Sequence, residues 1–214
     1  VATKGYVIRE RGDYNADARI DLSQIDFDML KAHFEKGHKH IEFEKLRGAI
    51  SEKLNHMVQL NQSRMDYLEK FQRLIDEYNS GSRNLELLFD KLVAFTQELS
   101  AEEHRTITEQ LSEEELAVFD LLTRPKMELS EKEKDEVKKV ARDLLDTLKR
   151  EKLVLDWRKK QQARAQVLLT VQQVLDELPR AYTPAIYQRK CDEVYQHIYD
   201  SYYGQGQSIY AAAS

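Results

Sequence analysis

Residues 41–78 read IEFEKLRGAISEKLNHMVQLNQSRMDYLEKFQRLIDEY, and the spacing of their apolar side chains decides the fold class. These side chains recur at steps of three and four residues, which is the period of an α-helix, and pause only around Asn61. The positions are Leu46, Ile50, Leu54, Met57, Met65, Leu68, Phe71, Ile75 and Tyr78. The pattern predicts one long helix, against which several shorter helices pack.

The next segment predicts a reversal of the chain and a second helix. Gly81 permits a positive φ, and the side chain of Asn84 can accept the first free amide hydrogens of a helix. A new apolar stripe follows, formed by Leu85, Leu88, Leu92, Phe95 and Leu99. We therefore expect this helix to run antiparallel to the long one.

Further helix starts are predicted by capping boxes, in which a Ser hydroxyl and a Glu carboxylate bond reciprocal backbone donors. The three pairs are Ser100 with Glu103, Ser112 with Glu115, and Ser130 with Glu133. Thr183 followed by Pro184 predicts the start of a last helix, which we expect to end at Gly204.

Composition agrees with a helical protein. The chain has 214 residues, 33% charged and 41% hydrophobic, with only seven Gly and three Pro, a mixture that is typical of amphipathic helices. We predict an all-α fold, an irregular helical bundle built around one long helix with several shorter capped helices. Residues 1–25 are expected to be an extended segment that links to a larger polypeptide, residues 26–204 a helical domain, and residues 205–214 a frayed tail.

Charge and cysteine content exclude several classes of protein. A net charge of −5 gives no overall attraction for phosphates, so any contact with DNA must come from a local patch. A single cysteine, Cys191, excludes an internal disulfide framework and fits a reducing cytoplasm. Since no apolar stretch approaches the roughly 18 residues that span a bilayer, we expect no membrane segment.

Sequence motifs for catalysis are missing. No glycine begins a G-x-x-x-x-G-K-[ST] loop or a G-x-G-x-x-G turn, so no backbone cradle for nucleotide phosphates is predicted. None of the three prolines is followed by Asp, so the Pro-Asp pair that often opens a metal-dependent nuclease core is absent too. We expect no catalytic residue and no bound cofactor in this chain.

One cluster of possible metal ligands lies close to Gly37, where we expect a turn after a short helix at residues 26–36. It consists of His33, His38, His40, Glu42 and Glu44. The H-x-H-x-E-x-E spacing would need an extended strand to align the ligands, whereas the neighbourhood is typical of helix, turn and helix. Solvated surface histidines are therefore expected, and a small metal-dependent hydrolase is the rival interpretation. For Cys191 we expect a buried thiol that packs as a small apolar residue.

The segment 157–164 is the candidate binding site. Trp157 is followed by Arg158, Lys159, Lys160 and Arg164, and an aromatic edge beside cationic groups suits an acidic protein face or a phosphate backbone. Because the whole chain is acidic, a structural or subunit-docking role is favoured over contact with DNA. Five tyrosines near the C-terminus recur at helical spacing, which favours core packing or a protein interface: Tyr187, Tyr195, Tyr199, Tyr202 and Tyr203.

Several stretches together resemble the C-terminal helical region of the R subunit of type I restriction enzymes. They are DYNADARIDL at 13–22, LIDEYNSGS at 74–82, LSEEELAVFDLLT at 111–123, VLDWRK at 154–159 and YQHIYDSYYG at 195–204. The resemblance spans nearly the whole chain. None of these stretches holds a chemical motif, so no catalytic residue can be carried over.

The resemblance implies a parent enzyme, an ATP-dependent site-specific deoxyribonuclease with a nuclease domain and two motor domains that use ATP and magnesium. It also implies partners: modification and specificity subunits that form a methyltransferase core, the parent's own motor domains, and DNA in the assembled complex. The expected function of this region is to dock the motor and nuclease subunit to that core. The alternative is a module that contacts the DNA backbone and guides the duplex through the motor.

Overall fold

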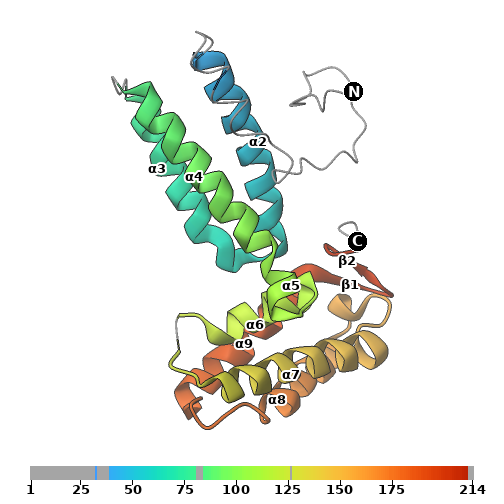
Figure 1. Ribbon diagram of the computed structural model, residues 1–214. Helices are drawn as coiled ribbons and strands as arrows, with labels where there is room; N and C mark the ends of the chain where they lie inside the picture. Colours follow the sequence, from blue (N-terminus) through green and yellow to red (C-terminus); the bar gives the residue numbers. More distant parts are fainter. Residues whose placement is uncertain (1–31, 33–38, 81–83, 126, 212–214) are drawn as a thin grey trace, which may run out of the picture. The chain divides into compact units, whose positions relative to one another are not determined.

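The computed structural model describes residues 32, 39–80, 84–125 and 127–211. The segment 1–25, which was expected to be extended, lies outside these residues, as do residues 26–31 and 33–38. The described chain is almost entirely helical, which confirms the all-α prediction (Figure 1).

The chain divides into two compact units, where the sequence predicted a single helical domain over 26–204. The first unit contains the described residues up to Val58 together with Arg64–Arg105. The second unit contains Gln59–Ser63 and the described residues from Thr106 onward. Each unit has its own hydrophobic core.

The first unit is built from three helices that lie side by side (Figure 1). They are α2 (Lys39–Leu60), α3 (Met65–Asn79) and α4 (Leu85–Glu103), with a short 3-10 turn at Gln62–Arg64. Their apolar stripes meet in a core that includes Leu46, Ile50, Leu54, Phe71, Ile75, Leu88, Leu92, Phe95 and Leu99. The rings of Phe71 and Phe95 stack at a centroid distance of 5.8 Å.

The prediction of one long helix over 41–78 is wrong, because the helix breaks at Asn61. The Asn61 side chain accepts a hydrogen bond from the backbone N–H of Ser63 at 3.1 Å and donates one to Asp120 at 2.8 Å. A side chain that bonds the backbone two residues ahead competes with the helical hydrogen bonds. The pause in apolar spacing at Asn61 therefore marks a reversal between α2 and α3, and the two helices run antiparallel (Figure 1).

The start of α4 follows the prediction, whereas its end does not. The Asn84 side chain accepts a hydrogen bond from the backbone N–H of Leu87 at 3.0 Å, as expected for an N-cap. The capping box predicted at Ser100 is wrong, since Ser100 lies inside α4. The helix continues past Ser100, and Glu102, two residues further, is buried and forms an ion pair with buried Arg64 at 3.0 Å.

The second unit contains a longer series of elements. They are α5 (Arg105–Glu109), α6 (Glu113–Thr123), α7 (Glu131–Thr147), the π-helix η3 (Leu148–Lys152), the 3-10 turn η4 (Trp157–Lys159), α8 (Gln161–Leu175), α9 (Pro184–Ser201), and the strands β1 (Tyr202–Gly204) and β2 (Gln207–Ser208). Helices α6 to α9 pack around one core. The capping boxes predicted at Ser112 and Ser130 both form and begin α6 and α7.

The C-terminal segment is ordered through residue 211, so the prediction of a frayed tail after Gly204 is wrong there. Helix α9 ends at Ser201, and the chain then forms an antiparallel hairpin of β1 and β2. Gly204 and Gly206 adopt φ values of 101° and 75°, which permit this turn. Tyr210 beyond the hairpin is only 3% exposed, and its hydroxyl donates to the carbonyl of Leu60 at 2.7 Å. The buried Tyr210 ring anchors the segment.

None of the helices that the structure describes is both long enough and apolar enough to cross a membrane.

Candidate functional site

Trp157 is fully buried, which corrects the prediction that it offers an aromatic edge to a partner. Its indole Nε1 donates a hydrogen bond to the carbonyl of Tyr202 at 3.1 Å, and its ring meets Tyr199 edge-on at a centroid distance of 5.8 Å. The ring is large, so burying it stabilises the fold more than leaving it in water next to its basic neighbours. Trp157 therefore fixes the loop that carries the candidate cations.

Arg158 is half-buried and tightly held by the last helix. Its Nη1 donates to the carbonyl of Tyr199 at 3.0 Å. Its guanidinium carbon lies 5.3 Å from the ring centroid of Tyr199 and 4.8 Å from that of Tyr203, within the range of cation–π attraction. The position of this guanidinium is thus set by the protein before any partner arrives.

The three remaining candidate cations differ in their surroundings. Lys159 is largely exposed and pairs with Asp156 at 2.9 Å, and the hydrogen bond from Lys159 lowers the pKa of the Asp156 carboxyl. The ammonium of Lys160 donates to the carbonyl of Leu155 at 3.3 Å. Arg164 lies half-buried in the first turns of α8. Within the described part of the chain, no carboxylate forms an ion pair with Arg158, Lys160 or Arg164.

Exposed apolar side chains precede Arg158 in the chain, and the exposed ring of Tyr203 lies against its guanidinium. Val154 is 47% exposed, Leu155 is 55% exposed, and Tyr203 is 42% exposed. The two strips of chain that carry them are joined, since the backbone N–H of Gln205 donates to the carbonyl of Leu153 at 3.0 Å. We call the surface formed by Val154, Leu155, Arg158, Lys160 and Tyr203 the Arg158 surface.

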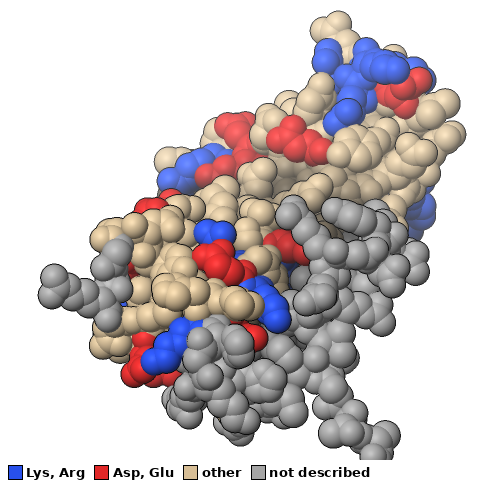
Figure 2. All heavy atoms as spheres, turned by 90° about the horizontal axis from the view of Figure 1, so that it is seen from above, with Lys and Arg blue, Asp and Glu red and all other residues tan. Residues whose placement is uncertain are grey.

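Basic residues concentrate around this surface. Residues 149–164 contain seven Lys or Arg and two Asp or Glu, a net charge of +5, whereas the whole chain carries −5. Figure 2 shows acidic and basic side chains interspersed over the face that it draws, with one group of Lys and Arg near the upper right. The segment 149–164 is therefore the local basic patch that an acidic chain would need to attract an anionic partner.

A hollow of about 240 Å³ lies beside the hairpin, lined by residues of α6, η3 and the C-terminal segment. In it the Tyr202 hydroxyl donates to a carboxylate oxygen of Glu114 at 2.7 Å, and Lys149 pairs with the other oxygen at 2.9 Å. Burial, with the nearby Glu114 charge, raises the pKa of Tyr202. Glu114 of α6 is thus bonded to the hairpin through Tyr202 and to η3 through Lys149.

A partly buried hydrogen-bond chain, which the sequence pattern does not predict, supports the same segment. The Nε2 of His197 lies 3.1 Å from the Tyr210 hydroxyl, and its Nδ1 lies 3.4 Å from the Ser201 hydroxyl. Since the Tyr210 hydroxyl donates its proton to Leu60, it accepts the Nε2 proton of a neutral His197. Burial lowers the pKa of His197 to about 4.

The predicted cluster of metal ligands is only partly described. His33 and His38 lie outside the described residues. His40, Glu42 and Glu44 lie in helix α2, where neighbours two residues apart point in different directions, and Nδ1 of His40 is 3.2 Å from the Tyr78 hydroxyl. Among the residues that the structure describes, no three His, Cys, Asp or Glu side chains gather as a metal site would require.

Cys191 and its neighbour are both fully enclosed. Burial raises the pKa of the Cys191 thiol, as expected for a thiol that packs as a small apolar residue. The ammonium of buried Lys190 donates to the carbonyl of Leu121 at 2.5 Å and to Glu193 at 2.7 Å. Lys190 thus neutralises the C-terminal end of α6, a role that the sequence analysis missed.

The five C-terminal tyrosines, three in α9 and two in β1, divide between core and surface. Tyr202 is buried, while Tyr187, Tyr195 and Tyr199 pack against the core from its edge. The Tyr187 hydroxyl donates to Asp176 at 2.7 Å, which joins α9 to the end of α8. Tyr203 is the exposed member of the group.

Comparison with known proteins identifies a family. A family model described as "Type I restriction enzyme HindI endonuclease subunit-like, C-terminal" matches residues 14–202. Searches of curated proteins and of solved structures return no significant match.

Proposed function

Because this chain belongs to the family of C-terminal regions of type I restriction enzyme endonuclease subunits, we propose that it attaches that subunit to the methyltransferase core. The modification and specificity subunits form this core. In this proposal the chain supplies a rigid surface for assembly, and DNA translocation and cleavage belong to the nuclease and motor parts of the parent enzyme. We expect those parts to use ATP and magnesium, and we expect the assembled enzyme to work in the cytoplasm.

The observation that carries the proposal is the rigid loop that presents the Arg158 surface. Trp157 is buried beneath this loop, and its backbone N–H donates to the carbonyl of Val154 at 3.2 Å. A surface that is already rigid loses little conformational entropy on binding. Such a surface suits a permanent interface between subunits.

DNA contact is the second candidate function, and a specific observation favours it. Arg158, Lys160 and Arg164 have no carboxylate partner within the described residues and could contact phosphates. Against it stand the exposed aliphatic side chains of Val154 and Leu155, which offer nothing to a phosphate backbone. Docking to protein is therefore preferred.

Sedimentation velocity separates the two functions. The chain is mixed with the purified methyltransferase core, and in parallel with a short DNA duplex. Docking predicts a stable complex with the core and no complex with the duplex at physiological salt, since duplex affinity of a weakly basic patch falls steeply with added salt. Failure of the chain to sediment with the core, together with salt-sensitive binding to the duplex, would favour the DNA function.

A further inference from the structure

We infer that the Arg158 surface is the docking site for an acidic protein segment that carries a central apolar side chain. In this arrangement Arg158 binds a carboxylate of the partner, and Val154 and Leu155 cover the partner's apolar side chain. The inference rests on the proposed docking function and assigns to it a surface and a partner chemistry.

The apolar part of the surface is the first support. Val154, Leu155 and Tyr203 are each more than 40% exposed and lie on two strips of chain that are bonded to each other. The two strips lie close together, because a Cβ added at Gly204, next to Tyr203, would lie 2.4 Å from the carbonyl oxygen of Val154. Exposed apolar side chains that cluster in this way are typical of interaction sites, and single scattered ones are not.

The second support is the state of Arg158. One guanidinium nitrogen donates to Tyr199, and the two tyrosine rings restrict the rest of the side chain. The remaining N–H groups can form the two parallel hydrogen bonds with which arginine binds a carboxylate. Since the side chain is already ordered, binding costs little rotamer entropy. Arginine and tyrosine are also the residues that most often carry the binding energy of protein interfaces.

Charge complementarity identifies the partner as acidic. Lys160 and Arg164 follow Arg158 along the chain, and within the described residues they also have no ion-pair partner. Residues 149–164 together carry a net charge of +5. Basic flanking residues around an apolar centre steer an acidic segment to the surface and raise its association rate.

The exposed apolar side chains at the centre of the surface favour a protein partner over DNA. Protein–DNA interfaces are more polar and more positively charged than interfaces between proteins. At the Arg158 surface, three of the five residues are apolar or aromatic and exposed, namely Val154, Leu155 and Tyr203. A duplex would leave the two aliphatic side chains without a complementary contact.

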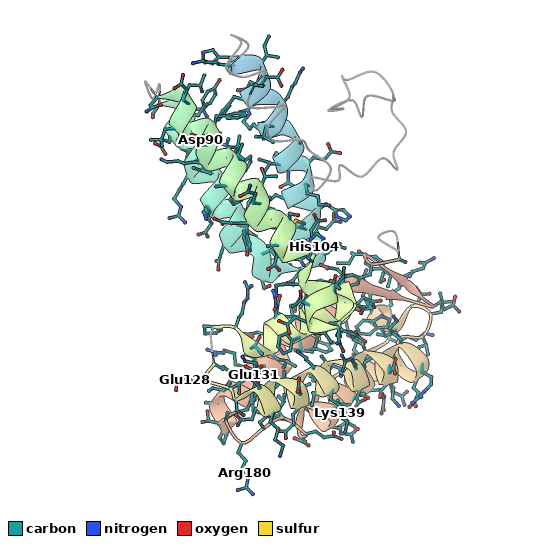
Figure 3. The ribbon with its side chains drawn as sticks, viewed as in Figure 1. Asp90, His104, Glu128, Glu131, Lys139 and Arg180 are labelled. Carbon is teal, nitrogen blue, oxygen red and sulfur yellow. The ribbon has the colours of Figure 1, made fainter. Side chains whose placement is uncertain are left out.

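Two variants with matched controls test the inference. Leu155→Ser removes the apolar centre, and Lys160→Glu reverses one flanking charge. Leu169→Ser alters another exposed leucine, which lies ~12 Å along α8 from its first residue, Gln161. Lys139→Glu makes the same charge reversal on the exposed side of α7 (Figure 3). Fluorescence of Trp157, the single tryptophan, reports whether each variant keeps the native environment beneath the surface.

The readout is the dissociation constant of the whole chain for the purified methyltransferase core, measured by titration calorimetry. We expect Leu155→Ser, at the apolar centre, to weaken binding about ten-fold. Lys160→Glu should weaken it several-fold by slowing association, and both controls should bind as the wild type does. Equal binding by the wild type, both variants and both controls would overturn the inference and leave the docking function standing.

Two further outcomes are informative. If the wild-type chain does not bind the core at all, the proposed function fails and the inference fails with it. The same proteins are also titrated with a DNA duplex at low and high salt. A loss of salt-sensitive duplex binding in Lys160→Glu, with core binding unchanged, would overturn the protein partner in favour of DNA.

Discussion

Acidification should destabilise the second unit through His197. This imidazole is neutral in the folded protein, where burial lowers its pKa from 6.5 to about 4. In the unfolded chain the same group has its ordinary pKa and binds a proton more readily. The unfolded state therefore gains protons first as pH falls, so the contribution of His197 to stability is fully present above pH 6.5 and is lost as pH falls toward 4.

The size of the effect follows from the two pKa values. At about 1.4 kcal/mol for each unit of pKa difference, the largest loss is about 3 kcal/mol, reached below pH 4. Between pH 7.5 and pH 5.0 the loss amounts to about 2 kcal/mol. This is a large share of the stability of a small domain, which is about 5–15 kcal/mol.

Urea unfolding followed by Trp157 fluorescence measures this loss. Trp157 is the single tryptophan and lies in the second unit, so its signal follows that unit alone. The control variant is His197→Gln, whose side-chain amide can still donate to the Tyr210 hydroxyl but does not titrate. Comparing the two proteins at pH 7.5 and 5.0 cancels the contribution of all other groups.

Between these two pH values, the free energy of unfolding of the wild type should fall by about 2 kcal/mol more than that of His197→Gln. If both proteins lose the same stability, His197 is protonated as easily in the folded state as in the unfolded state. The proposed buried hydrogen-bond chain through His197 would then be refuted.

Three further substitutions test the packing of the second unit. Gly204→Ala places a Cβ 2.4 Å from the carbonyl oxygen of Val154 at a φ of 101°, and should lower the melting temperature by several degrees in calorimetry, about 2 kcal/mol of stability. Tyr210→Phe removes the buried hydroxyl that donates to Leu60 and should lower the free energy of unfolding by about 1–2 kcal/mol, measured in urea. An unchanged midpoint would show that the tail is not anchored there. Ser130→Ala removes the capping hydroxyl of α7 and should cost about 1 kcal/mol, seen as faster amide hydrogen exchange in its first turn.

Much of the helical architecture was predictable because it depends on local sequence. Apolar spacing predicted which segments are helical, and Ser112, Ser130 and Asn84 start their helices as their side chains indicate. These features depend on hydrogen bonds between residues three or four apart. The reversal at Asn61 was missed because it also depends on Asp120, far away in sequence.

The structure shows the surroundings of the candidate site residues, and their binding role stays a prediction. The cations of segment 157–164 were found from charge alone, and Lys159 and Lys160 are exposed as expected. Trp157 was assigned to the surface because its neighbours are basic, whereas its indole finds an acceptor in Tyr202, 45 residues away. The exposure of Val154 and Leu155 was not predicted, because an apolar pair in a helical protein is normally assigned to the core.

Tertiary hydrogen bonds also explain why the tail was misjudged. Residues 205–211 have no helical or capping pattern, so they resemble a terminus without structure. Their order depends on the Tyr210 hydroxyl, which reaches Leu60, a residue 150 positions earlier. No pattern within a single sequence reports such a pairing.

Hydrogen–deuterium exchange of the chain, alone and bound to the methyltransferase core, shows which segments the core covers. If the core binds the Arg158 surface, binding should slow exchange in two segments, residues 153–160 and 199–205. Exchange on the exposed face of α7 should stay unchanged. Slower exchange confined to other parts of the chain, with both of these segments unaffected in a demonstrated complex, would contradict docking at this surface.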